Sequence, residues 1–220
     1  NQVQKDFNLF QKNQAETITK VHVDGTLIHI GGGHDHAYPL VDSLFQKYEH
    51  ITVINLDAHL YTRADEIKHS GTPFRQLKDK YKDKLELIQV GIHDFANVDE
   101  NYEQISMKTT TVNQLKKLTN NFNDNKTFIQ ELLRELDTSK TQVVLSLDID
   151  AIDSTQMKAV SAVNHDGLLM SFINEFFSAY KDLEQRDNII GLYEYNPLYD
   201  DISCSGARLI SASLYNFIME

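Results

Sequence analysis

Short apolar, β-branched runs alternate with helical patterns along almost the whole chain, and this alternation constrains the fold most strongly. The runs predict β-strands at Thr26–Ile30, Ile51–Leu56, Leu85–Ile92, Thr109–Val112, Gln142–Leu147 and Ile189–Tyr193. Helical patterns cover residues 3–20, 37–48, 113–118, 124–136, 168–180 and 207–219, and residues 61–83 predict a loop followed by a short helix. Strands that alternate with helices usually pair in parallel, so we predict an α/β fold with a mostly parallel sheet.

Length, charge and cysteine content narrow the class of protein. The 220 residues fit a single domain over 1–220, and a net charge of −11 without clusters of Lys and Arg argues against nucleic-acid binding. No apolar stretch approaches the roughly 20 residues that cross a bilayer. The lone Cys204 excludes an internal disulfide and fits a reducing compartment, so we expect a cytoplasmic protein. The chain lacks an initiator Met, and we expect a fragment or a chain trimmed at its N-terminus.

Carboxylates and imidazoles follow three of the predicted strands. The segments are Gly-Gly-Gly-His-Asp-His at 31–36, Asp-Ala-His at 57–59 and Ser-Leu-Asp-Ile-Asp at 146–150. In parallel α/β sheets ligands bind beyond the carboxyl ends of the strands. The i, i+2 spacing in Asp57/His59 and Asp148/Asp150 places both members of each pair on one face of an extended backbone. Together with His34, these side chains can converge on one point.

Several carboxylates packed together repel one another unless cations neutralise them. Mixed carboxylate and imidazole ligands without thiolate suit manganese or iron better than a structural zinc ion. Two ions about 4 Å apart could share a water and lower its pKa. Taken singly, the glycine run also fits an ordinary loop or an anion nest, and Asp-x-Asp also fits a helix N-cap. The three segments together favour a metal-dependent hydrolase.

These motifs resemble the ureohydrolase superfamily, which comprises arginase, agmatinase and formimidoylglutamase. Its members carry Gly-Gly-x-His, Asp-Ala-His-x-Asp, Ser-x-Asp-x-Asp and Glu-x-Asn-Pro in this order, and the similarity runs from about Leu27 to the C-terminus. The segments 31–34, 70–76 and 194–197 resemble the formimidoylglutamase branch most. Arginases and agmatinases usually have His where Ser70 stands. The resemblance implies a three-layer α/β/α fold.

The resemblance also implies a metal site and a substrate. The manganese ligands would be His34, Asp57, His59, Asp148 and Asp150, with Asp57 and Asp148 bridging two ions. Glu194 would be the catalytic residue that faces an amidine or guanidine group, because a carboxylate offers planar acceptors to a planar cation. The expected reaction converts N-formimidoyl-L-glutamate and water to L-glutamate and formamide, with agmatine- or arginine-like substrates second. Arg63 would bind a substrate carboxylate, with a solvated surface arginine as the alternative. Family members often form oligomers, so a homo-oligomer stays open.

The chain departs from the family pattern in two main places, besides a minor change at Ser154, which follows Asp153 where the family commonly has Pro. Tyr61 stands where Asp-Ala-His-x-Asp has its second aspartate, and a phenol with a pKa of about 10 is a poor manganese ligand at neutral pH. We therefore expect the ion beside His34 to bind weakly or not at all. The family's N-terminal β/α portion is also missing, which exposes a sheet edge. An alternative therefore stays open: a metal-deficient, catalytically impaired protein that uses the fold for binding or assembly.

Overall fold

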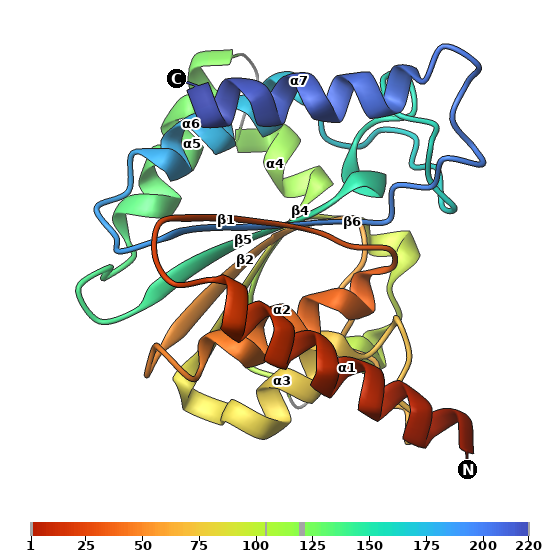
Figure 1. Ribbon diagram of the computed structural model, residues 1–220. Coiled ribbons are helices and arrows are strands. Elements are labelled where there is room, and N and C mark those ends of the chain that lie inside the picture. Colours follow the sequence, from red (N-terminus) through yellow and green to blue (C-terminus); the bar gives the residue numbers. More distant parts are fainter. Residues whose placement is uncertain (1, 104, 119–121, 220) are drawn as a thin grey trace.

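The computed structural model describes residues 2–103, 105–118 and 122–219 (Figure 1). Its strands are β1 (Thr26–Ile30), β2 (Ile51–Leu56), β3 (Leu85–Ile92), β4 (Lys108–Thr111), β5 (Gln142–Asp148) and β6 (Asn188–Tyr193). They form one sheet in the order β1-β6-β5-β2-β3-β4, and every neighbouring pair is parallel. The prediction of a parallel α/β sheet is confirmed.

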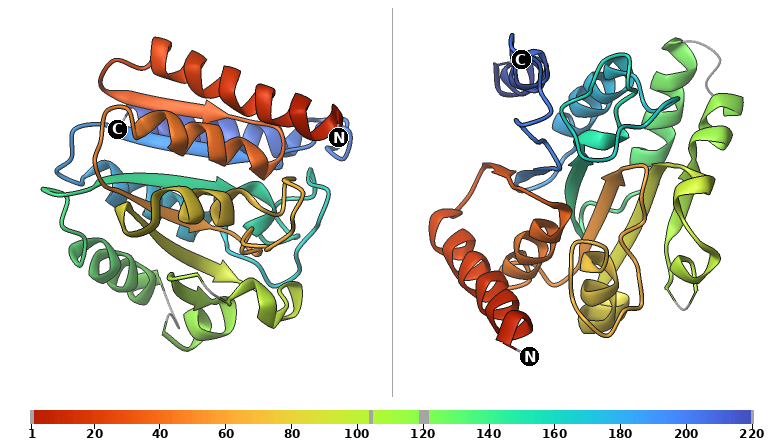
Figure 2. Two further views of the ribbon diagram at one scale, coloured as in Figure 1. Left: turned by 90° about the horizontal axis from the view of Figure 1, so that it is seen from below. Right: turned by 90° about the vertical axis from the view of Figure 1, so that its right-hand side faces the viewer.

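Helices cover both faces of this sheet and make three layers. They are α1 (Gln2–Val21), α2 (Ala37–Leu44), α3 (Pro73–Tyr81), α4 (Val112–Leu118), α5 (Phe122–Arg134), α6 (Met170–Lys181) and α7 (Ser205–Met219). Helices α1, α2 and α3 lie on one face, and α4 to α7 lie on the other (Figures 1 and 2). The three-layer arrangement implied by the resemblance is therefore observed.

One helix is shorter than its pattern predicts. Helix α2 ends at Leu44, whereas the apolar spacing predicted a helix to Tyr48. The backbone forms a turn there, with the N–H groups of Lys47 and Tyr48 both donating to the carbonyl of Leu44. The side chains of Lys47 and Tyr48 then reach the buried carboxylate of Asp187, which precedes β6. A tertiary contact therefore accompanies the early end of the helix, and local spacing cannot show such a contact.

The alternation along β2 explains how the sheet is buried on both sides. Ile51 and Val53 pack into the apolar cluster beneath α2 and α3, whereas Ile54 and Leu56 pack into the larger cluster beneath α5 and α6. All six β2 residues are buried. A strand covered on both faces is expected to be apolar throughout, as this one nearly is.

The topology brings the polar segments to one edge of the sheet. Strands β1, β6, β5 and β2 are consecutive neighbours and all run in the same direction. The segments that follow these four strands therefore meet beyond their carboxyl ends, where ligands bind in parallel α/β sheets. Among the described helices, none is both long enough and apolar enough to cross a membrane.

Candidate metal centre

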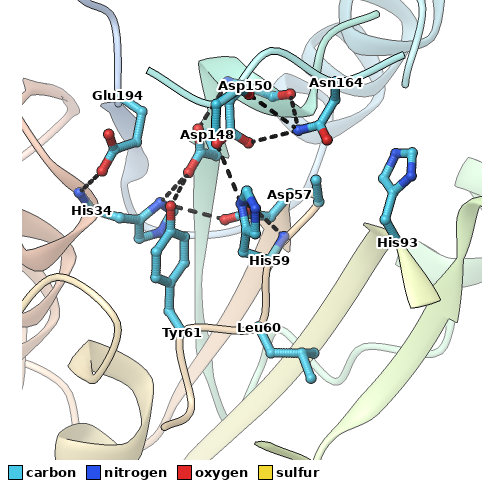
Figure 3. A network of polar contacts seen from close by, with 12 residues as sticks. His34, Asp57, His59, Leu60, Tyr61, His93, Asp148, Asp150, Asn164 and Glu194 are labelled. Atoms are coloured by element: carbon cyan, nitrogen blue, oxygen red, sulfur yellow. Dashed lines mark hydrogen bonds and ion pairs between the residues drawn. The ribbon is translucent and has the colours of Figure 1, made fainter. Parts of the chain in front are cut away.

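Three carboxylates and one imidazole converge beyond the ends of β2 and β5. We call Asp57, His59, Asp148 and Asp150 the acid–histidine cluster. One ligand atom from each residue lies within 4.8 Å of the corresponding atoms of the others. The Nδ1 atom of His59 is 3.3 Å from Oδ2 of Asp150 and 3.6 Å from Oδ1 of Asp57. Figure 3 shows these side chains pointing toward one another.

The same local turn follows both strands and holds the first carboxylate of each pair. The backbone N–H of His59 donates to Oδ1 of Asp57 at 2.7 Å, and that of Asp150 donates to Oδ1 of Asp148 at 2.8 Å. These are turns in which an aspartate bonds the backbone two residues later. The i, i+2 spacing read from the sequence therefore orients each carboxylate as well as pairing it with a second ligand. On Asp57, the other oxygen accepts a hydrogen bond from Nδ2 of Asn55 at 3.0 Å.

The glycine run after β1 delivers His34 to the same place. The Nδ1 atom of His34 lies 3.0 Å from Oδ2 of Asp148 and 3.4 Å from Oδ2 of Asp57, and all three side chains are fully buried. A Cβ on Gly31 would lie 2.8 Å from the ring of Tyr193, which explains the need for glycine at that position. The cluster is thus extended by a second histidine that comes from a different strand.

Glu194 joins the site from the end of β6. Its Oε1 accepts a hydrogen bond from the backbone N–H of His34 at 2.7 Å, and its own N–H donates to the carbonyl of Gly32 at 2.8 Å. The glycine-rich turn therefore binds a carboxylate from its own chain, which accords with the anion-nest interpretation. Glu194 has a φ of +66°, a left-handed backbone conformation that costs on the order of 1–3 kcal/mol and is frequent at functional sites.

Tyr61 fills the space where the family pattern has an aspartate. Its ring stacks on the imidazole of His34, with centroids 4.3 Å apart and planes inclined by 24°. Its hydroxyl donates to Oδ2 of Asp148 at 2.8 Å. Like Glu194, Tyr61 has a left-handed backbone conformation, with a φ of +50°. The sequence marked Tyr61 as a lost ligand, but it gave no sign of this hydrogen bond or of the stacking.

Burial and mutual repulsion perturb the protonation of the cluster. Burial and the neighbouring Asp148 raise the pKa of Asp57, and the same two causes raise the pKa of Asp150 well above its usual range. For His59, burial acts to lower the pKa, but the Asp150 and Asp57 carboxylates raise it to about 11. Burial, followed by repulsion from Asp148, also raises the pKa of Glu194. The apoprotein cluster therefore holds protons that a divalent cation would replace.

The donors of the acid–histidine cluster fit a divalent metal ion. Nδ1 of His59 is buried and makes no hydrogen bond within the described part of the chain, although it faces two carboxylates. Carboxylate oxygens with an imidazole nitrogen, and without thiolate, suit manganese or iron. A nitrogen that makes no hydrogen bond and faces carboxylates 3.3 and 3.6 Å away is what a ligand set presents to a cation. The side chains of the cluster thus suit a divalent cation.

A cavity of about 530 Å³ opens onto the cluster. His59, Tyr61, Asp150 and Glu194 line it, and so does Arg63. The Arg63 side chain is 58% exposed, and its Nε is 3.0 Å from Oδ2 of Asp65. A small substrate could therefore reach both the cluster and a cationic side chain from the same cavity.

The structure gathers five predicted ligands and Glu194 in one place, and their roles as ligands and catalyst stay predictions. Arg63 lines the same cavity, with its exposed side chain paired to Asp65. His36 is close to His34 in sequence, yet its Nδ1 is 2.7 Å from Nε2 of Gln14, so it contacts helix α1. Ser146 was not singled out, although its Oγ is 3.1 Å from Nε2 of His34. Ser146 lies two residues before Asp148 and so on the same face of the strand, and this spacing could have indicated that it belongs to the site.

Comparisons with known proteins agree with this geometry. The model of the arginase family matches residues 2–219. The formimidoylglutamase of Klebsiella pneumoniae is 29% identical over 190 residues, which cover 81% of this chain and 56% of that protein. The chain thus spans little more than half the length of this relative.

Solved structures show the same fold. The formimidoylglutamase of Bacillus subtilis superposes with a TM-score of 0.80 at 21% identity, covering 98% of this chain and 68% of that one. A variant of Trypanosoma cruzi formiminoglutamase with Mn²⁺ superposes with a TM-score of 0.74 at 21% identity, covering 97% and 70%. At these identities the likeness concerns the fold alone.

Proposed function

The chain belongs to the arginase family, and on that premise we propose that it is a manganese-dependent hydrolase of linear amidine C–N bonds. The proposed substrate is N-formimidoyl-L-glutamate, which water converts to L-glutamate and formamide. The name of the Klebsiella pneumoniae relative supports this choice among family substrates. The sequence Ser70-Gly71-Thr72-Pro73 supports it too, because agmatinases and arginases usually carry His where Ser70 stands.

The observation that carries the proposal is the buried acid–histidine cluster at the floor of an open cavity. Asp57, His59, Asp148 and Asp150 would hold a manganese ion. The Mn²⁺ in the Trypanosoma cruzi relative supports the choice of metal. A bound divalent ion lowers the pKa of water and polarises the substrate, which makes hydrolysis feasible at neutral pH.

The remaining roles fall to side chains of the cavity. Glu194 is anchored by the backbone of His34 and lines the cavity, so its carboxylate can accept hydrogen bonds from a planar amidinium group. Such a contact fixes the orientation of the amidine carbon relative to the cluster. Arg63 would bind a carboxylate of the substrate in this cavity, exchanging its present partner Asp65 for it. A glutamate-type substrate supplies that carboxylate, whereas agmatine does not.

A second candidate function is favoured by Tyr61. Its hydroxyl bonds Asp148 where the family pattern has a carboxylate, so this chain lacks one of the family's acidic ligands. A protein with a weakened metal site would keep the fold for binding or assembly without turnover.

We further propose that residues 1–220 form one domain and that the protein is cytoplasmic. In the cytoplasm the exposed free thiol of Cys204 stays reduced.

The test measures the formamide that the manganese-loaded chain releases from N-formimidoyl-L-glutamate, and the urea that it releases from agmatine and from arginine in separate assays. Release from N-formimidoyl-L-glutamate alone is the expected result. Glu194→Gln should lower kcat/KM about 10- to 100-fold, the loss of a charged hydrogen bond, and leave the metal content unchanged. Glu49→Gln is the matched control, because the Glu49 side chain is 75% exposed and pairs only loosely with Lys84 at 3.6 Å. A folded chain that retains no metal and hydrolyses none of the three substrates would refute the enzyme and favour the binding protein.

A further inference from the structure

The two histidines of the site differ in what their inward nitrogens contact. Nδ1 of His59 faces carboxylates without making a hydrogen bond within the described part of the chain. Nδ1 of His34, in contrast, is hydrogen-bonded to Oδ2 of Asp148 at 3.0 Å, while its Nε2 lies 3.1 Å from Oγ of Ser146. The nitrogen that would have to bind a second ion is therefore already used in a hydrogen bond.

A second donor reaches the same carboxylate oxygen. The Tyr61 hydroxyl donates to Oδ2 of Asp148 at 2.8 Å, beside the His34 contact. Figure 3 shows both side chains pointing at this oxygen from the same side. The phenol acts as a hydrogen-bond donor in this contact, whereas a cation needs acceptors. The part of the site around His34 and Tyr61 therefore presents hydrogen-bond donors where a metal ion needs lone pairs.

Packing holds this arrangement in place. The His34 ring is stacked on Tyr61, and the rings of Phe74 and Tyr193 lie against it at centroid distances of 5.4 and 4.8 Å. His34 is fully buried among these aromatic rings. The imidazole cannot turn its Nδ1 toward another partner without displacing large, buried side chains. The hydrogen-bonded arrangement is thus a fixed feature of the packing.

We propose that this chain forms a one-ion centre, in which the Tyr61 hydroxyl and the His34 ring occupy the place of the family's second ion. The ion would be held by the acid–histidine cluster, and Oδ2 of Asp148 would be neutralised by two hydrogen bonds instead of a second cation. This inference rests on the proposed function for the first ion. It concerns the number of bound ions and the effect of Tyr61 on that number, and both can be measured without any enzyme activity.

The test measures the manganese content per chain after loading and removal of excess ion, together with the EPR spectrum. Wild type should retain about one ion and give the spectrum of an isolated Mn²⁺. Tyr61→Asp restores a carboxylate and should raise the content to about two ions with an exchange-coupled spectrum. The backbone at residue 61, with a φ of +50°, suits aspartate better than tyrosine. Tyr61→Phe is the matched control, because it removes the hydroxyl, adds no ligand and should stay at one ion.

A pair of histidine variants keeps the test decisive if Tyr61→Asp fails to fold. His59→Asn should weaken the affinity for the retained ion by at least about tenfold, since it removes a direct ligand. His34→Asn should change that affinity much less. Two coupled ions in wild type would overturn the one-ion centre and leave the hydrolase proposal standing. Equal losses from the two histidine variants would also overturn it, whereas a folded wild type without metal or turnover would instead refute the proposed function.

Discussion

The acid–histidine cluster should destabilise the metal-free protein, and Asp150→Asn tests this directly. The substitution nearly preserves the shape of the side chain but replaces one of three buried ionisable carboxyl groups with a neutral amide. The backbone N–H of residue 150 can still donate to Oδ1 of Asp148, a contact of 2.8 Å that does not involve the altered side chain. We therefore expect the metal-free variant to be more stable than metal-free wild type, although it has lost a metal ligand.

The magnitude follows from the distances. At an effective dielectric constant of about 20, two like charges within 4.8 Å repel by roughly 3 kcal/mol, and Asp150 has two such neighbours, Asp57 and Asp148. The attraction to protonated His59 at 3.3 Å returns roughly 5 kcal/mol, which leaves a net penalty on the order of 1–2 kcal/mol. Burial adds to that penalty. We expect a gain of about 2 kcal/mol, or roughly 4–8 °C in Tm for a chain of this size.

The assay is thermal and urea unfolding at neutral pH, in chelator and then in saturating Mn²⁺. Because the pKa of Asp150 is raised in the folded state, wild type should lose stability relative to the variant as the pH rises above about 4, the unfolded value. In Mn²⁺ at a hundred times its Kd, wild type gains about 2.7 kcal/mol, and the variant, with its weaker site, gains less. A variant that is less stable than wild type in chelator would refute this electrostatic reasoning.

Two further substitutions test contacts away from the cluster. The buried hydroxyl of Tyr180 accepts a hydrogen bond from the N–H of Ile189 at 2.9 Å and also contacts one carbonyl of β5 and one of β6. Tyr180→Phe should therefore lower the free energy of unfolding by about 1–3 kcal/mol in urea denaturation and leave the manganese content unchanged. For Asp187, burial acts to raise the pKa, but Lys47 and Tyr48 lower it to about 2. The stability that Asp187 contributes is therefore present above about pH 4 and lost as the pH falls toward 2. Asp187→Asn should lower the free energy of unfolding by about 2 kcal/mol at pH 7. The variant should also lack this acid-dependent loss of stability when unfolding is followed by circular dichroism.

Much of the fold could be predicted because its signals are local. The bounds of β1, β2 and β3 agree with the apolar runs residue for residue. For the inner strands β2 and β3 the reason is burial on both faces, whereas β1 lies at the sheet edge and is partly exposed. The helices agree to within a few residues, and α2 ends early where tertiary contacts take over. The prediction that residues 1–220 form one domain stays a prediction.

The site was predictable only as far as its local spacing allowed. The i, i+2 pairs Asp57/His59 and Asp148/Asp150 carry their own turn geometry, so their placement followed from sequence and topology. The contacts of Tyr61 did not, because they join a loop after β2 to a ring that follows β1 and a carboxylate that ends β5. Nothing local distinguishes a tyrosine that stacks in a site from one that packs elsewhere.

The site neutralises its carboxylates in two different ways, and this difference connects the stability of the protein to its chemistry. Asp148 receives hydrogen bonds at one oxygen from Tyr61 and His34 and at the other from the backbone N–H of Asp150, so both of its oxygens are bonded by the protein itself. Asp150, in contrast, has only longer side-chain contacts among the described residues, with Nδ1 of His59 at 3.3 Å and Nδ2 of Asn164 at 3.4 Å, and a charge buried without full pairing costs several kcal/mol. A bound cation would remove that cost on the side that opens to the cavity. Metal binding should therefore stabilise the fold most at the point where substrate enters, and the Asp150→Asn comparison measures that coupling.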